Sequence, residues 1–107
     1  MNDLPDGVSR ATLGVRGGLT RSAFEETSEA MFLSSGYVYP SAEVAEQSFT
    51  GEVDHYVYSR YGNPTVSMFQ ERLRLIEGAP AAFATASGIA AVFVSLGALL
   101  GAGDRLV

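Results

Sequence analysis

The chain has 107 residues, a length that fits one small domain or part of one and excludes two separately packed cores. Hydrophobic residues make up 47% and charged residues 18%, which excludes a disordered chain, and no apolar run approaches the roughly 20 residues of a membrane-spanning helix. The net charge of -5 argues against nucleic-acid binding through a basic face, and the absence of cysteine excludes disulfides and thiol nucleophiles.

The two ends of the chain indicate its compartment and its extent. The start, MNDLPDGVSR, has acids and a proline where a signal peptide would need a basic segment and an apolar run, so we expect a cytoplasmic protein. All seven basic residues are arginine, and lysine is absent. The last residues, GDRLV, begin an apolar run without a terminating signal, and we therefore expect a piece of a larger domain.

The first half of the chain predicts an arm. Residues 1 to about 36 hold several glycines among polar residues and show no sustained helical or strand period, which predicts an extended segment. A short helix is expected over about 42–49, because Ser41 can cap it and Glu43 falls in its first turn. Residues 1–50 thus form the expected arm with its short helix, and residues 51–107 the start of a larger domain.

A strand and a long helix are predicted next. Residues 56–61, YVYSRY, are mostly aromatic and β-branched, which favours an extended strand. Asn63 can cap a helix that has Pro64 in its first position, and Gly78 supplies a left-handed end. Between them, one apolar face recurs at helical spacing: Val66, Phe69, Leu73 and Ile76.

The last part of the chain predicts an α/β unit. Residues 81–86, AAFATA, are typical of a short buried strand, and Ser87 and Gly88 then begin an apolar helix that ends at Gly101. This helix is apolar on nearly all sides, so it should be covered on more than one face. After a turn at Gly103, residues 104–107 begin a second strand. The order predicts the α/β class, with a mostly parallel sheet and helices on both faces, of which the chain holds the first part.

The turn at Ser87, Gly88 and Ile89 is the first candidate site. A strand that ends in Ser-Gly and leads into a helix places unpaired backbone N–H groups and the positive helix end at one point, which suits a phosphate. Gly88 has no side chain to keep an anion at a distance. The same glycine also suits close packing of the strand on the helix, and spacing alone leaves both interpretations open.

The second candidate site is YVYSRYGNPT. In an extended segment, Tyr56, Tyr58 and Arg60 project to one face, where two phenols and a guanidinium suit a dianionic phosphate. From composition alone, an aromatic edge strand with a solvated arginine is favoured. The acidic cluster of Glu25, Glu26 and Glu29 is more typical of a solvent-facing surface than of a metal site.

These motifs together resemble a known family. YSRYGNPT at 58–65, LIEG at 75–78 and TASGIAAV at 85–92 strongly resemble the Cys/Met-metabolism family of pyridoxal-phosphate (PLP) enzymes, in the right order and over nearly the whole chain from about residue 10. The stretch from TLGVRGG to AEQSF further resembles one branch, the O-succinylhomoserine sulfhydrylases. The resemblance implies the N-terminal part of a fold-type I PLP-dependent transferase large domain.

The resemblance also implies roles for both candidate sites. Tyr58 and Arg60 would bind the cofactor phosphate of the neighbouring subunit, and Ser87, Gly88 and Ile89 would hold the phosphate of their own subunit. The Schiff-base lysine and the other groups that act on cofactor and substrate would follow Val107. No catalytic residue is therefore expected in this chain, which we expect to be inactive alone.

The activity implied by the resemblance is the conversion of O-succinylhomoserine and sulfide to homocysteine, in methionine biosynthesis, by a homo-oligomer that is a dimer of dimers. Cystathionine γ-synthase, O-acetylhomoserine sulfhydrylase and methionine γ-lyase share the motifs and remain alternatives. An alternative of another class is a non-catalytic phosphate-binding or interaction module. No nucleic acid, membrane or metal is expected to bind.

Overall fold

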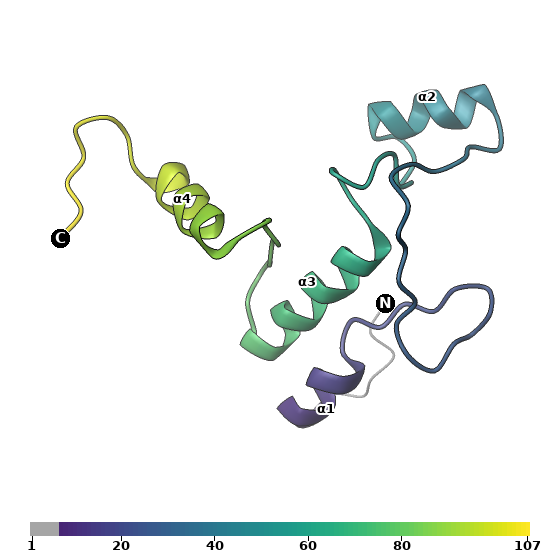
Figure 1. Ribbon diagram of the computed structural model, residues 1–107, viewed down its shortest axis with the longest axis horizontal. Helices are drawn as coiled ribbons and strands as arrows, with labels where there is room; N and C mark the ends of the chain where they lie inside the picture. The colour runs from purple at the N-terminus through teal and green to yellow at the C-terminus, as the bar shows by residue number, and fades with distance from the viewer. Residues whose placement is uncertain (1–6) are drawn as a thin grey trace.

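The structure, a computed structural model, describes residues 7–107, so most of the acidic start of the chain lies outside it. Its four helices are α1 (Arg10–Arg16), α2 (Ala42–Thr50), α3 (Pro64–Glu77) and α4 (Gly88–Leu99). Figure 1 shows α1 beside α3, with α2 and α4 on opposite sides of this pair. Within the described residues, α1 and α3 are the only helices that pack on each other. None of the four has the length and apolarity needed to cross a bilayer.

Helices α2 and α3 confirm the predictions made from their capping residues. The Thr65 amide donates to Asn63 Oδ1 at 2.9 Å, and Pro64 takes the first helical position. Gly78 ends α3 with φ +64°, a conformation that glycine adopts without strain. Ser41 caps α2 by accepting from the Val44 amide at 3.3 Å. Local hydrogen bonds therefore set both starts.

Helix α1 contradicts the prediction that residues 1–36 form only an extended arm. Ser9 caps it, accepting from the Thr12 amide at 3.2 Å, and the chain then turns closely onto α3 at Gly17 and Gly18. The Arg72 side chain donates to the Gly17 carbonyl at 2.8 Å. A helix this short gains little from propensity alone. We attribute its formation to this docking, which the local sequence does not show.

The predicted strands at 56–61, 81–86 and 104–107 do not form in the described part of the chain. Its one bridge pairs Gly36 with Tyr58, in antiparallel orientation. At Tyr58 the carbonyl accepts from the Tyr61 and Gly62 amides at 2.9 and 3.1 Å, so a turn replaces the second half of the first strand. A strand needs a neighbour for its backbone groups, and residues 81–86 and 104–107 have none here. The predicted parallel sheet is therefore absent from these residues.

The cover expected over the apolar helix is also absent from the described chain. Helix α4 has no buried residue, and Phe93 and Leu99 are 77% and 82% exposed. Phe83, expected in a buried strand, is 86% exposed. The helix ends at Leu99, two residues before the predicted Gly101, because Leu100 is already extended. The turn at Gly103 does form, with φ +98°.

Candidate functional site

The Ser87 turn has the geometry expected of an anion site at a helix start. Ser87 Oγ accepts from the Ala90 amide at 3.2 Å, and the Ala91 amide makes the first intrahelical bond, to the Ser87 carbonyl, at 3.1 Å. The amides of Gly88 and Ile89 precede that bond and so have no partner within the helix. A Cβ placed on Gly88 would meet nothing within 4 Å. Two N–H groups without a helical partner therefore lie at the positive end of α4, beside the open space at Gly88.

The Tyr58 loop brings together two of its three predicted residues. The Arg60 guanidinium carbon lies 5.7 Å from the centre of the Tyr58 ring, and both side chains are exposed. Tyr61 lies edge-on to Tyr58, with ring centres 6.5 Å apart. The aromatic neighbours leave the Arg60 donors available for charge-assisted bonds to an anion.

Tyr56 does not join this pair, contrary to the prediction of one common face. Its phenol donates to Ser67 Oγ on α3 at 3.0 Å, and its ring packs 5.5 Å from that of Tyr37. The alternation expected of a strand fails because residues 56 and 57 form no strand and the chain turns directly after Tyr58. The second candidate site therefore consists of Tyr58 and Arg60 alone.

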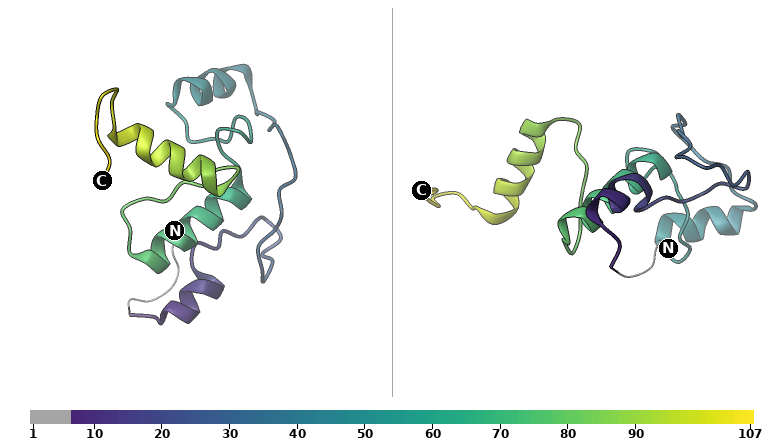
Figure 2. Two further views of the ribbon diagram at one scale, coloured as in Figure 1. Left: turned by 60° about the vertical axis from the view of Figure 1, so that its left-hand side comes forward. Right: turned by 90° about the horizontal axis from the view of Figure 1, so that it is seen from below.

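The two candidate sites of one chain stand apart. Helix α4 packs on no other helix of the described residues. In Figure 1 and in the right-hand view of Figure 2, α4 and its first turn lie on one side of α3, and the loop between α2 and α3 lies towards the other. Within one chain, the loop that carries Arg60 thus lies away from the start of α4.

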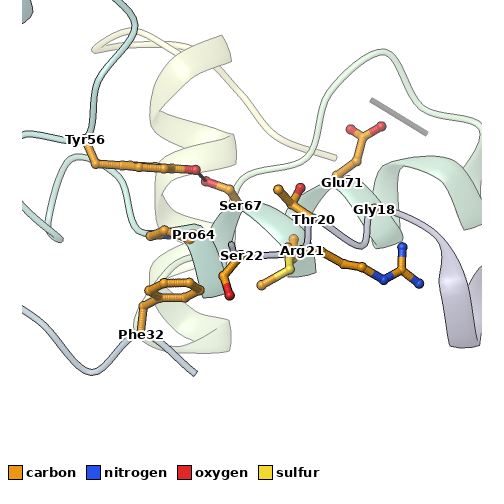
Figure 3. Close-up of a pocket in the computed structure, with 10 residues that line it drawn as sticks. Gly18, Thr20, Arg21, Ser22, Phe32, Tyr56, Pro64, Ser67 and Glu71 are labelled. Carbon is orange, nitrogen blue, oxygen red and sulfur yellow. Dashed lines mark hydrogen bonds between the residues drawn. The ribbon is translucent and has the colours of Figure 1, made fainter. Parts of the chain in front are cut away.

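A pocket that the sequence did not indicate lies between the arm and α3 (Figure 3). Its volume is about 350 Å³, and its walls include Thr20, Phe32 and Tyr56. Its two charged side chains already have partners, since Arg21 donates to the Glu26 carbonyl at 3.1 Å and Glu71 pairs with an arginine of α3. Residues far apart in sequence build this pocket, so no motif marks it.

Two of the acidic residues of the arm, Glu26 and Glu29, are bound to separate partners. The Ser22 amide donates to Glu26 Oε1 at 2.8 Å, and this bond lowers the pKa of Glu26. Glu29 pairs with Arg72 of α3, and its pKa is lowered, first by a hydrogen bond to its own amide and then by Arg72. In the part of the chain that the structure covers, no three metal-binding side chains come together.

Comparison with known proteins gives a consistent result. The family described as Cys/Met metabolism PLP-dependent enzyme matches residues 11–107. An O-succinylhomoserine sulfhydrylase of Mycobacterium tuberculosis is 84% identical over 104 residues, which are 97% of this chain and 26% of the relative. The protein of that name from Pseudomonas aeruginosa is 44% identical over 95% of this chain and 25% of its own length. An L-methionine gamma-lyase of Porphyromonas gingivalis is 35% identical over 91% of this chain and 24% of its own length.

A crystal structure of another protein has a similar fold over most of this chain. It is that of an O-acetylhomoserine (thiol)-lyase from Campylobacter jejuni with N'-pyridoxyl-lysine-5'-monophosphate at position 205. It matches 92% of this chain and 24% of its own, with a TM-score of 0.82 at 28% identity. The chain thus spans about a quarter of the length of these relatives. Since the family pattern covers nearly all of its residues, the chain belongs to the Cys/Met metabolism PLP-dependent enzyme family.

Proposed function

We propose that this chain is the phosphate-anchoring part of a cytoplasmic PLP-dependent enzyme that converts O-succinylhomoserine and sulfide to homocysteine. The observation that carries the proposal is the 84% identity to an O-succinylhomoserine sulfhydrylase over 97% of the chain. Within a fold-type I large domain, residues 81–86 and 104–107 would find neighbouring strands, and further elements would cover α4. O-acetylhomoserine sulfhydrylase, cystathionine γ-synthase and methionine γ-lyase are the alternatives within the family.

The Ser87 turn fits the phosphate group of PLP. Two amides and the Ser87 hydroxyl proton are available as donors, and the space in front of Gly88 is open. Ser87, Gly88 and Ile89 would hold the phosphate of their own subunit. When bound, PLP supplies an electron sink for the chemistry at the substrate. The chain has no lysine, so its own contribution is to bind and orient the cofactor.

Tyr58 and Arg60 would bind the phosphate of a neighbouring subunit. They are exposed and lie side by side, and in Figure 1 their loop, between α2 and α3, lies away from α4. Arg60 can donate two charge-assisted hydrogen bonds and Tyr58 one. A homodimer, repeated in a dimer of dimers, would complete each site from two chains.

A chimera tests this function. Residues of this chain replace the matching stretch of the M. tuberculosis relative, and homocysteine is measured from O-succinylhomoserine and sulfide. We expect product, and we expect Arg60→Ala to weaken PLP binding by about 10- to 100-fold, because bonds to a charged group are worth about 1.5–3 kcal/mol. Arg10→Ala, on the exposed side of α1, is the matched control and should leave PLP binding unchanged.

Two results would overturn the proposal. A folded chimera that binds PLP and forms no homocysteine would refute the sulfhydrylase activity. Equal PLP affinity of the Arg60→Ala chimera and its parent would refute the role of Arg60 at the phosphate.

A further inference from the structure

The turn that carries Tyr58 and Arg60 is not part of a sheet in the described chain. One antiparallel bridge, between Gly36 and Tyr58, is the only strand-type contact of the described residues. A loop without a sheet ladder needs other bonds if its side chains are to keep a fixed direction. Those bonds come from the Ser59 amide and from polar side chains on the inner side of the same turn.

Ser59 ties the turn to residues 34–37 of the arm. Its amide donates to the Ser35 carbonyl at 3.0 Å, and its hydroxyl donates to the Ser34 carbonyl. The same oxygen lies 3.2 Å from the Tyr37 hydroxyl and 3.1 Å from Asn63 Nδ2. A serine hydroxyl has one donor and two acceptor positions, and all three are used here. Ser59 therefore points inward, while its neighbours Tyr58 and Arg60 stay exposed.

Asn63 completes this arrangement from the start of α3. It is 6% exposed, and its Nδ2 donates to the Phe32 carbonyl at 2.8 Å and to Ser59 Oγ at 3.1 Å. Its Oδ1 caps α3 through the Thr65 amide. The side chain thus performs two separate tasks, and only the cap is visible in the sequence. An aspartate could keep the cap but would lose both donors.

We propose that Ser59 and Asn63 are positioning residues for the phosphate-binding pair Tyr58 and Arg60. They fix the inner side of the turn against the arm, so that the outer side presents its phenol and guanidinium already oriented. Binding then costs little ordering of the loop, which is the general basis of tight binding by a pre-organised site. This inference rests on the proposed function, in which Tyr58 and Arg60 bind the phosphate.

The test uses the chimera in its cofactor-free form, titrated separately with PLP and with pyridoxal, which lacks the phosphate. Asn63→Asp keeps the cap and removes the two donors, and Ser59→Ala removes the hydroxyl. We expect each to weaken PLP binding about 10-fold, equivalent to about 1.4 kcal/mol, and to change pyridoxal binding less than about two-fold. Ser41→Ala, which removes the cap of α2, should alter neither affinity.

A double variant separates positioning from direct contact. If Ser59 acts through Arg60, then Ser59→Ala should add no further loss of PLP affinity to Arg60→Ala. Equal losses for PLP and pyridoxal would show a general structural role and overturn the inference. It would also fail, with the proposed function intact, if Arg60→Ala weakened PLP binding and neither Ser59→Ala nor Asn63→Asp did. Unchanged PLP binding by Arg60→Ala would instead overturn the proposed function itself.

Discussion

Gly18 is the position where one methyl group should do most damage to the fold. The residue is buried, and its φ of +69° is strained for any side chain. An added Cβ would lie 2.9 Å from the Met68 carbonyl oxygen and 2.9 Å from the Arg72 amide nitrogen, both on the backbone of α3. Backbone atoms cannot rotate away, so α1 must move off α3.

The expected cost of Gly18→Ala combines two effects. A left-handed conformation costs an alanine about 1–2 kcal/mol, and overpacking adds about 1–3 kcal/mol. We expect a total of about 2–5 kcal/mol, measured in the chimera as the free energy of local opening from hydrogen exchange of the α1 and α3 amides. The packing of α1 on α3 should be lost before the rest of the chain opens.

Two other glycines serve as matched controls. Gly78 has φ +64° with nothing within 4 Å of an added Cβ, so Gly78→Ala tests strain without a clash and should cost about 1–2 kcal/mol. Gly14 lies inside α1 and is equally open, so Gly14→Ala should stabilise that helix by about 0.5–1 kcal/mol. Equal costs for Gly18→Ala and Gly78→Ala would refute the argument from close approach.

Three further predictions concern the arm and α4. Arg72→Lys should weaken protection of α1 from hydrogen exchange, because it loses the bond from Arg72 Nε to the Gly17 carbonyl. Arg74→Lys should cost less than about 1 kcal/mol, because the pair of Arg74 with Glu71 is only half-buried and lies within one helix. The pKa of Glu29 is lower in the folded state than its ordinary 4.5. The stability that ionised Glu29 contributes is therefore present above about pH 4.5 and is lost as the pH falls through the folded pKa. In urea unfolding, a Glu29→Gln variant should lose less free energy of unfolding across that pH range than the parent does. The 107-residue chain alone should self-associate through α4, and Phe93→Gln with Leu99→Gln should raise its monomer fraction in sedimentation; an unchanged fraction would contradict this.

The sequence predicted those elements whose causes are local. Asn63, Pro64 and Gly78 determine α3 through bonds and φ angles within a few residues, and its bounds were correct. Helix α1 was missed because it forms by docking on α3, and only in the folded chain do Gly17 and Gly18 come into close contact with α3. The strands at 81–86 and 104–107 were predicted from composition, and a strand also needs a partner that local composition does not supply.

In the candidate sites, too, the features with local causes were predicted and those that depend on distant residues were not. The helix start at Ser87 was correctly predicted, because its cap follows from adjacent residues, whereas the strand expected before it does not form. Tyr58 and Arg60 lie side by side as predicted, but Tyr56 was added by assuming a strand over 56–61, where only Tyr58 forms a bridge. The inward bonds of Ser59 reach residues of the arm that no spacing rule connects to it.

Subunit mixing tests most directly the central claim that two chains complete each phosphate site. One chimera carries Arg60→Ala, and the other carries Gly88→Val, whose side chain meets no protein atom at Cβ but fills the space in front of the amides. Each alone should bind PLP weakly. After the two are unfolded together and refolded, hybrid dimers should contain one site with both defects and one intact site, so tight PLP binding should reappear. No recovery of tight sites in verified hybrid dimers would contradict a site shared between subunits.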